Sequence, residues 1–176
     1  MSRCVAAIII GYYVAAHAQS SFRLQNVGVG VYALVRDWNG ALLSGAQWRA
    51  EVYGGVSETS LFPLVSYYNG ARAIMPFDSP GFFRETGSAD YPSVISAPAA
   101  SGVWLQVKVW DVGLGPTYED AVDRQVGGYG ESNIFFAVGG DPRGTIPGEM
   151  PYLVGLQSFH VLREIPEPSV AALLFL

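Results

Sequence analysis

The sequence has few of the residues from which many active sites and covalent frameworks are built. Its 176 residues include one cysteine, two histidines and one lysine. A single cysteine excludes an intrachain disulfide framework and a cysteine-based zinc site. Acidic residues outnumber basic ones by 15 to 10, for a net charge of −5. That balance argues against a nucleic-acid partner, because Lys and Arg must neutralise the phosphates.

Long apolar runs are also missing. No stretch reaches the roughly 18–20 residues that a membrane-spanning helix needs. Yet half of the residues are hydrophobic and 13% are aromatic, which is too much buriable surface for a disordered chain. A chain of this length buries roughly 70% of its unfolded surface. The composition therefore predicts one folded domain with a core of its own.

The first 18 residues have the three parts of a secretory signal peptide. Arg3 supplies the positive charge, residues 5–16 form an apolar run, and Ala16 and Ala18 form an A-x-A cleavage site. We therefore predict that a signal peptidase cuts after Ala18, which would remove the only cysteine. The alternative is that these residues form a buried N-terminal helix or strand.

The C-terminal segment, residues 165–176, combines a proline-rich motif with an apolar run. Pro166, Glu167 and Pro168 precede Ser169 and the apolar residues 170–176. Two prolines enforce an extended backbone, which a processing enzyme can bind. Pro-Glu-Pro before a terminal apolar run resembles the PEP-CTERM sorting signal of exported bacterial proteins. The alternative is an ordinary proline-rich tail.

The PEP-CTERM resemblance implies a location for the protein and an enzyme that processes it. It implies that an exosortase-type membrane protease cuts at the motif, after transient membrane association through the tail, and that the protein reaches the cell envelope, the outer surface or the extracellular space. The family's signal continues as a full membrane helix that ends in arginines. Here the apolar run is seven residues, which rise only ~10 Å against a ~30 Å hydrocarbon core. The signal is either truncated in this chain or degenerate.

Residues 19–164, between the two terminal segments, show the alternation of half-buried β-strands. The clearest example is 103–110, in which Val103, Leu105 and two further valines take one face and Trp104 and Lys108 belong to the other. We predict an all-β fold, a single antiparallel β-sandwich or jelly-roll-like domain, with one short helical turn. Further strands are predicted around 27–34, 47–53, 134–138 and 153–162, and turns at Asn39-Gly40, Gly54-Gly55, Asn69-Gly70, Gly127-Gly128 and Gly139-Gly140.

The helical turn is predicted at residues 118–123. Thr117 can cap it, and Asp120 three residues further on completes a capping box. The body is also similar to the bodies of other exported PEP-CTERM proteins, in segments that include residues 48–55 and 107–111. That similarity implies no particular activity.

Four aromatic residues are candidates for binding a ligand. Trp104 and Trp110 lie on the polar face of the 103–110 strand, where we expect partial exposure, and Tyr67 and Tyr68 follow each other in a loop. Exposed flat rings on a sheet can stack on the apolar faces of sugars, so an extracellular polysaccharide is a possible partner. The alternative is that these rings belong to the core or its rim.

Acidic residues around the predicted helix are candidates for binding Ca²⁺, a hard cation that prefers oxygen ligands. They are Asp111, Glu119, Asp120 and Asp123. The alternative is a solvated acidic turn. A hydrolase would need two carboxylates from the set Asp111, Glu119, Asp123 and Glu131 to converge, with one of them desolvated. The tight turn at Asp37-x-Asn39-Gly40 presents oxygens as well but lacks the other ligands of a calcium loop.

His160 would be the only histidine of a chain cleaved after Ala18. It lies in an alternating segment, and no G-x-S-x-G motif accompanies it, so a packed or edge-strand histidine is the preferred interpretation over a catalytic triad. The sequence therefore favours a non-catalytic exported protein with a structural or adhesive role. The alternative functions are a carbohydrate-binding module and, third, a secreted hydrolase.

Overall fold

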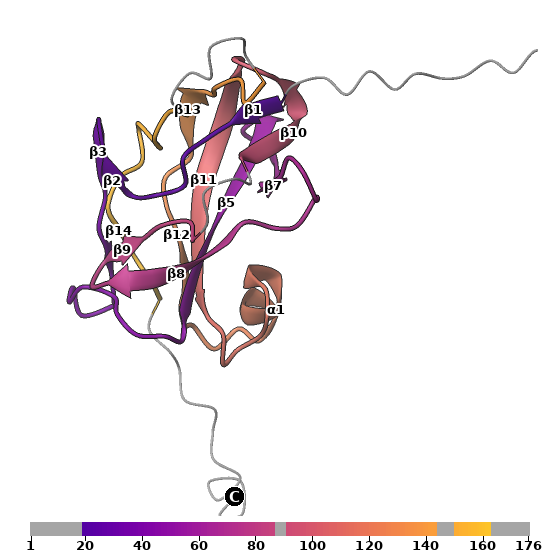
Figure 1. Cartoon of the computed structure of the whole chain (residues 1–176). Helices are drawn as coiled ribbons and strands as arrows, with labels where there is room; N and C mark the ends of the chain where they lie inside the picture. Colours follow the sequence, from indigo (N-terminus) through magenta and orange to yellow (C-terminus); the bar gives the residue numbers. More distant parts are fainter. Residues whose placement is uncertain (1–18, 87–90, 144–149, 163–176) are drawn as a thin grey trace, which may run out of the picture.

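The computed structural model describes residues 19–86, 91–143 and 150–162. The predicted signal peptide and the sorting tail, with Ala16, Ala18, Pro166, Glu167 and Pro168, lie outside these residues. The described chain is all-β with mostly antiparallel sheets and one short helix, which confirms the predicted fold class (Figure 1). Of the residues that the structure describes, none belongs to a helix long and apolar enough to cross a membrane.

The largest sheet is built on two ten-residue antiparallel strands, β5 (Trp48–Ser57) and β11 (Gly102–Asp111). Its strand order is β12-β11-β5-β8-β9, where β12 is Tyr129–Glu131, β8 is Ile74–Ser79 and β9 is Phe82–Phe83. At the other end of the same two strands, β13 (Phe135–Val138) pairs with β11, and β6 (Ser60–Pro63) pairs with β5. We call this the main sheet.

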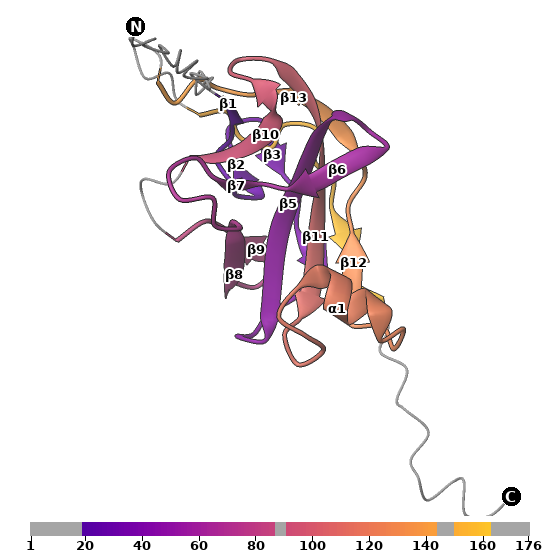
Figure 2. The same cartoon turned by 90° about the vertical axis from the view of Figure 1, so that its right-hand side faces the viewer.

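A second layer covers one face of the main sheet. It contains the three-stranded sheet β1-β10-β7, formed by Gln19–Ser21, Pro92–Pro98 and Val65–Ser66. The hairpin of β2 (Val27–Gly28) and β3 (Val31–Tyr32) lies on the same side (Figure 2). We call the covered face of the main sheet the inner face and the opposite one the outer face.

The inner face carries the core because every second residue of the long strands is apolar. Val103, Leu105, Val107 and Val109 of β11 are all fully buried, as the alternation predicts. They belong to one cluster with residues from the second layer, such as Phe22, Leu24, Val94 and Leu153. Burial of these side chains is the main source of stability, at about 25 cal/mol for each Å² of apolar surface.

The outer face is covered at one end by the helix α1 (Tyr118–Asp123). Thr117 caps it: its hydroxyl accepts a hydrogen bond from the Asp120 backbone N–H, and the Asp120 carboxylate accepts one from the Thr117 backbone N–H. The predicted helix and its capping box are confirmed. In Figure 2 the helix lies on the side of β5 and β11 opposite to β8 and β9.

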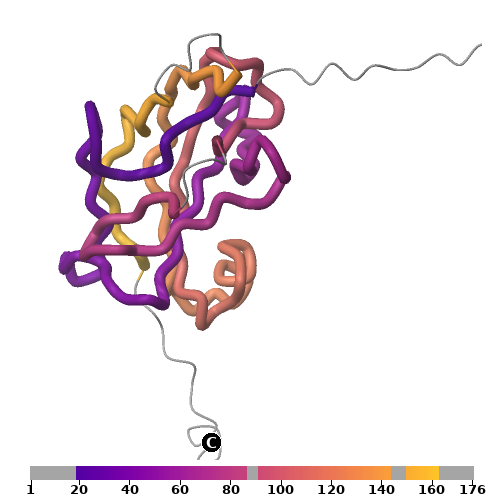
Figure 3. The backbone as a smooth tube through the Cα atoms, in the orientation of Figure 1, coloured from indigo at the N-terminus to yellow at the C-terminus, as the bar shows by residue number. Residues whose placement is uncertain are grey.

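Two predicted strands are wrong in extent. The segment 27–34 is the β2–β3 hairpin, because Gly30 takes a positive φ of 79° and turns the chain between them. Of the segment 153–162, only Phe159–His160 forms a strand, β14, and it pairs in parallel with β4 (Val35–Arg36). Figure 3 shows this late segment of the chain beside the early one.

The predicted turn at Gly54-Gly55 is also wrong, because both glycines lie inside β5. A Cβ atom on Gly54 would come within 3 Å of Val94, Leu105 and Leu64. Glycine is needed there for close packing of the second layer on the sheet, not for a turn. Gly40, Gly70, Gly127 and Gly128 do have the positive φ values that turn residues adopt.

Candidate functional site

The outer face of the main sheet carries a network of charged and aromatic side chains beneath α1. Strand register places Glu51 of β5 opposite Lys108 of β11, and Lys108 opposite Glu131 of β12. One row across three strands is therefore acid, base, acid. We use the name outer-face network for Glu51, Tyr53, Arg72, Gln106, Lys108, Tyr118, Glu119 and Glu131.

Glu51 is the most deeply buried charged group of this network, with no exposed surface. Arg72 binds its carboxylate with two donors, Nε at 2.7 Å from Oε1 and Nη2 at 2.5 Å from Oε2. The same Nη2 lies 2.8 Å from the Tyr53 hydroxyl oxygen. This bidentate contact is the geometry in which a guanidinium binds a carboxylate most strongly.

The helix α1 contributes the next part of the network. The Tyr53 hydroxyl donates a hydrogen bond to Oε1 of Glu119, and Arg72 lies 3.2 Å from Oε2 of the same carboxylate. Tyr118, the first residue of α1, donates from its hydroxyl to Glu131 of β12 at 2.7 Å. The helix is thus joined by side chains to β5, to β12 and to the segment that precedes β8.

Lys108, the only lysine of the sequence, lies between two tyrosine rings. Its Nζ is 4.3 Å from the ring centroid of Tyr53 and 4.7 Å from that of Tyr118. Glu131 Oε1 is 3.8 Å from the same nitrogen, and Gln106 donates to the other oxygen of Glu131 at 2.8 Å. The ammonium is therefore stabilised by two aromatic faces and one carboxylate.

The electrostatic shifts in the network follow from burial and pairing. Burial raises the pKa of the Glu51 carboxyl, and the hydrogen bond and charge of Arg72 act against that rise. Burial raises the pKa values of Tyr53 and Tyr118 as well, and their hydrogen bonds to Glu119 and Glu131 add to it. Both phenols therefore remain protonated donors at neutral pH.

Glu119 responds in the opposite direction. Its partial burial by itself would raise its pKa, but hydrogen bonds from Tyr53, from its own backbone and from Arg72 outweigh this, so the pKa is lowered. Within the described residues, no fully buried side-chain nitrogen or oxygen is without a hydrogen-bond partner. The fully buried polar atoms of the outer-face network are thus all hydrogen-bonded, and the bonds of Glu119 and Tyr118 attach α1 to the sheet.

The two candidate tryptophans have different environments, although they share a strand face. Trp110 is fully buried under α1 with Tyr118 and Ala121, and its indole N–H donates to Gly115 O at 3.1 Å. The expectation that Trp110 is partly exposed is therefore wrong, because the helix covers that end of the strand. Buried in this way, the ring offers no face to a ligand.

Trp104 lies beyond the end of α1 and is half-buried. Its ring meets that of Phe136 edge to face, with 5.4 Å between centroids, and Phe136 is 55% exposed. Register places Val138, also exposed, on the same outer face. We call Trp104, Phe136 and Val138 the outer patch.

Tyr67 and Tyr68 form a second aromatic group. Their rings meet at 5.3 Å, and Tyr68 also lies 6.0 Å from the ring of Tyr91. Tyr68 is 63% exposed, and the guanidinium of Arg143 lies over the Tyr67 ring. These side chains are separate from the outer patch in the sequence and in their contacts.

The four predicted calcium ligands each have a different local role. Asp111 accepts a hydrogen bond from Gly113 N at 2.7 Å, Asp120 closes the capping box, and Glu119 binds Tyr53. Asp123 is exposed at the last position of α1. Across residues 19–86, 91–143 and 150–162, no three His, Cys, Asp or Glu side chains gather as a metal would require.

Two further candidate residues, His160 and Asp37, have local structural roles. His160 is exposed in β14, beside Arg36 of β4, so it is the edge-strand histidine that the sequence favoured. Asp37 accepts hydrogen bonds from the backbone N–H groups of Asn39 and Ala41, at 2.8 and 2.9 Å. The Asp37 carboxylate therefore closes the local turn.

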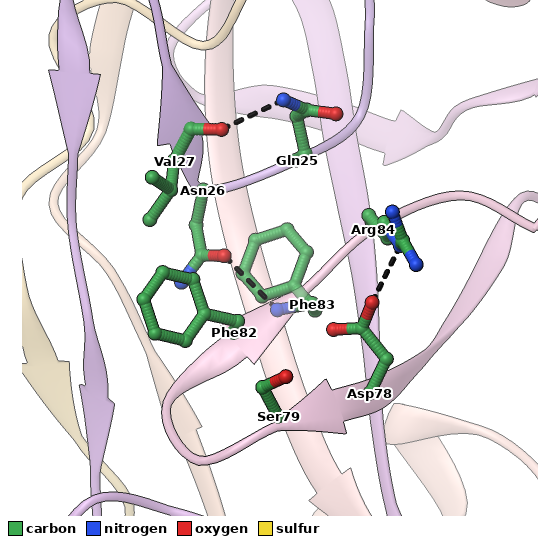
Figure 4. A pocket seen from close by; sticks show the side chains of 8 residues that line it. All are labelled: Gln25, Asn26, Val27, Asp78, Ser79, Phe82, Phe83 and Arg84. Atoms are coloured by element: carbon green, nitrogen blue, oxygen red, sulfur yellow. Dashed lines mark hydrogen bonds and ion pairs between the residues drawn. The ribbon is translucent and has the colours of Figure 1, made fainter.

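A surface pocket of about 280 Å³ lies beside β9 (Figure 4). Asn26, which is fully buried, donates to the backbone oxygens of Ala33 and Gly81 and accepts from Phe83 N. Arg84 pairs with Asp78 at 2.5 Å on one side of the pocket (Figure 4). The polar groups of this pocket hold neighbouring segments together.

Sequence reasoning missed the central members of the outer-face network. Glu51 and Tyr53 alternate with the buried Ala50 and Val52, which is a detectable signal that they share the other face of β5. Arg72 lies in a loop, and no period relates it to Glu51. Comparisons with protein-family models, with curated proteins and with solved structures find no match to this chain.

Proposed function

We propose that this chain is an exported, non-catalytic β-sandwich protein of the cell envelope or extracellular matrix, with a structural or adhesive role, sorted by its C-terminal Pro-Glu-Pro motif. The observation that carries the non-catalytic part is the outer-face network. Of its groups with shifted pKa values, Glu51, Tyr53, Arg72 and Glu119 are hydrogen-bonded to one another, and Tyr118 of α1 is hydrogen-bonded to Glu131 of β12. Such groups often mark catalytic sites, but here their bonds are used to hold α1.

The terminal segments support the exported part of the proposal. Arg3, the apolar run and the A-x-A site all come before Gln19, the first residue of β1, in the sequence. Pro166 to Pro168 come a few residues after β14 (Phe159–His160) in the sequence. Cleavage at both expected sites would leave strands β1 to β14 in the mature protein.

The test is to express the full chain in a diderm bacterium and to measure where it accumulates and its intact mass. We expect to find the protein outside the cytoplasm, with an intact mass equal to that of a chain that starts at Gln19. The control variant Ala18→Phe places a bulky side chain in the narrow peptidase cleft and should retain Met1. Wild-type protein that stays in the cytosol with Met1 attached would contradict the proposal.

The C-terminal signal is tested in the same host with an exosortase-type protease co-expressed. The expected result is a product shortened near Pro168, and no shortening in Pro168→Ala. An unshortened tail in both proteins would remove the sorting part of the proposal and leave the export part standing.

A carbohydrate-binding role is the second candidate, and the outer patch favours it. Trp104, which is half-buried, and Phe136, which is 55% exposed, present aromatic surface on the outer face of the main sheet. Affinity electrophoresis on a panel of acidic and neutral polysaccharides tests it. Retardation that is lost in Trp104→Ala and kept in Tyr32→Ala, a change at an exposed ring on β3, would support this role.

A further inference from the structure

A pocket of about 360 Å³ opens at the seam between the main sheet and the second layer. Gly54, Phe62 and Pro63 line it from β5 and β6, and Val65, Ile95 and Ser96 line it from β7 and β10. We call it the seam pocket. Its volume is within the roughly 300–1,000 Å³ typical of sites for small organic ligands.

The walls of the seam pocket are apolar and unusually open to solvent. Phe62 is 63% exposed and Ile95 is 62% exposed, although each has an apolar side chain. Phe62 belongs to β6 of the main sheet and Ile95 to β10 of the second layer. A ligand that covers both recovers hydrophobic free energy of about 25 cal/mol for each Å² of apolar surface removed from water.

The floor of the pocket is held in place by core packing. Gly54 lies against Val94, Leu64 and Leu105, and a Cβ atom at Gly54 would approach them within 3 Å. Val94, Leu64 and Leu105 are themselves fully or almost fully buried. The floor is therefore part of the rigid core, so that a ligand meets a preformed surface.

The charge at the rim decides which kind of apolar ligand fits. Among the described residues that line the pocket, Arg72 is the only charged one. Its guanidinium is already paired with Glu51 at 2.5 Å and with Glu119 at 3.2 Å. Two carboxylates against one guanidinium leave no surplus positive charge for an anionic headgroup.

We propose that the seam pocket binds an uncharged, largely apolar molecule that carries rings and has the size of a small polycyclic compound, with the Ser96 hydroxyl available to one polar group of the ligand. This inference goes beyond the proposed function and does not depend on it. Phe62 of the main sheet and Ile95 of the second layer both contact the ligand, and Gly54 forms the floor. A lipid-like anion is disfavoured by the carboxylates beside Arg72.

Two fluorescent probes with the same ring skeleton test the charge argument. N-phenyl-1-naphthylamine is neutral, and 8-anilinonaphthalene-1-sulfonate adds a sulfonate. Each is titrated into the purified chain, and fluorescence enhancement is followed to saturation. We expect saturable one-to-one binding of the neutral probe and weaker binding of the anionic one. No saturable binding of the neutral probe, or tighter binding of the anionic one, would overturn the proposal.

Two variants with opposite effects on surface hydrophobicity test the location. Ile95→Ser removes an apolar wall, while Ser96→Phe adds an apolar ring that fills the pocket. Both should weaken the neutral probe about tenfold, as loss of one to two kcal/mol of contact implies. If the probe instead bound non-specifically to any exposed apolar surface, its affinity for Ser96→Phe would be higher than for the wild type.

The matched control is Val29→Ser, which removes an exposed aliphatic side chain from the β2–β3 turn, away from the pocket. It should bind the probe as the wild type does. Circular dichroism melts of all variants separate lost binding from lost folding. Folded Ile95→Ser and Ser96→Phe proteins that bind like the wild type would refute the location.

Discussion

The two faces of β5 and β11 are made from the same twenty residues and are held by different forces. On the inner face, valines and Leu105 pack against the second layer, and contact there is non-directional. On the outer face, Glu51 and Lys108 form ion pairs with Arg72 and Glu131, and these two partners bind Glu119 and Tyr118 of α1. The comparison teaches that an apolar face tolerates an approximate partner, whereas a polar buried face needs every partner in place.

The largest effect is expected from the inner face. Leu105→Ala removes a fully buried side chain and should cost about 4 kcal/mol of unfolding free energy, because a cavity adds to the lost transfer free energy. Urea titration followed by circular dichroism measures it. The same change at Leu162, an exposed leucine, should cost no more than about 0.5 kcal/mol. Equal losses at both leucines would contradict the difference between core and surface.

On the outer face, Arg72→Met should cost about 3 kcal/mol, because it leaves the Glu51 carboxyl buried without its cation. We place the loss at the lower end of the range for buried pairs, since 31% of the Arg72 side chain is exposed. Adding Glu51→Leu to this variant should recover most of the loss, because two apolar side chains need no partner.

The control for Arg72 is Arg84→Met, which breaks the exposed pair with Asp78 and should cost at most about 1 kcal/mol. Chemical denaturation of the four proteins compares the two ion pairs directly. A double variant no more stable than Arg72→Met alone would show that Arg72 acts through something other than Glu51.

The helix cap has a smaller effect. Thr117→Ala removes the side-chain acceptor for the Asp120 N–H and should destabilise α1 by roughly 1 kcal/mol, while Thr117→Ser keeps the oxygen and should lose much less. Hydrogen exchange at the α1 amides measures the local opening. If α1 amides exchange equally fast in the wild type and Thr117→Ala, packing on Trp110 rather than the cap holds the helix.

The smallest effect is expected at Glu119, and it depends on pH. Its folded-state pKa is lowered, so its contribution is present above the unfolded pKa of about 4.3 and is lost as the pH falls through the lower folded value. Glu119→Gln should therefore cost less than about 1 kcal/mol at neutral pH, since 52% of the side chain is exposed. The difference in unfolding free energy between Glu119→Gln and the wild type should become smaller at acidic pH.

Denaturation midpoints at neutral and at acidic pH test the sign of this dependence. Glu58→Gln, at an exposed position in the β5–β6 connection, serves as the control and should change little at either pH. A difference between Glu119→Gln and the wild type that grows on acidification would mean that the Glu119 pKa is raised rather than lowered.

Local patterns predicted the elements that depend on local chemistry. The alternation in 103–110 and the capping box at Thr117 and Asp120 each involve neighbours in the sequence, and both are confirmed. The strand predicted over 153–162 is mostly wrong, because β14 forms only where β4 offers a partner. The Gly54-Gly55 turn is wrong for the same kind of reason, since Val94 packs there from another sheet.

The outer-face site was only partly predictable. Period two placed Trp104 and Trp110 on one face, as observed, but could not tell that α1 covers Trp110 and stops short of Trp104. Nor could it bring Arg72 to Glu51, because the contact joins residues 21 positions apart through the fold. Coverage of a face depends on where another element lies.

By itself the sequence determined the all-β class, the faces of the long strands, the capped helical turn and the shortage of thiol, imidazole and amine groups. These follow from side-chain period and composition, which act over a few neighbouring residues. Only the tertiary structure decided that Glu51 is buried against Arg72, that Lys108 lies between two tyrosines and that an apolar pocket opens at the seam. Those outcomes depend on how two layers and a helix dock, and docking joins residues that no local pattern relates.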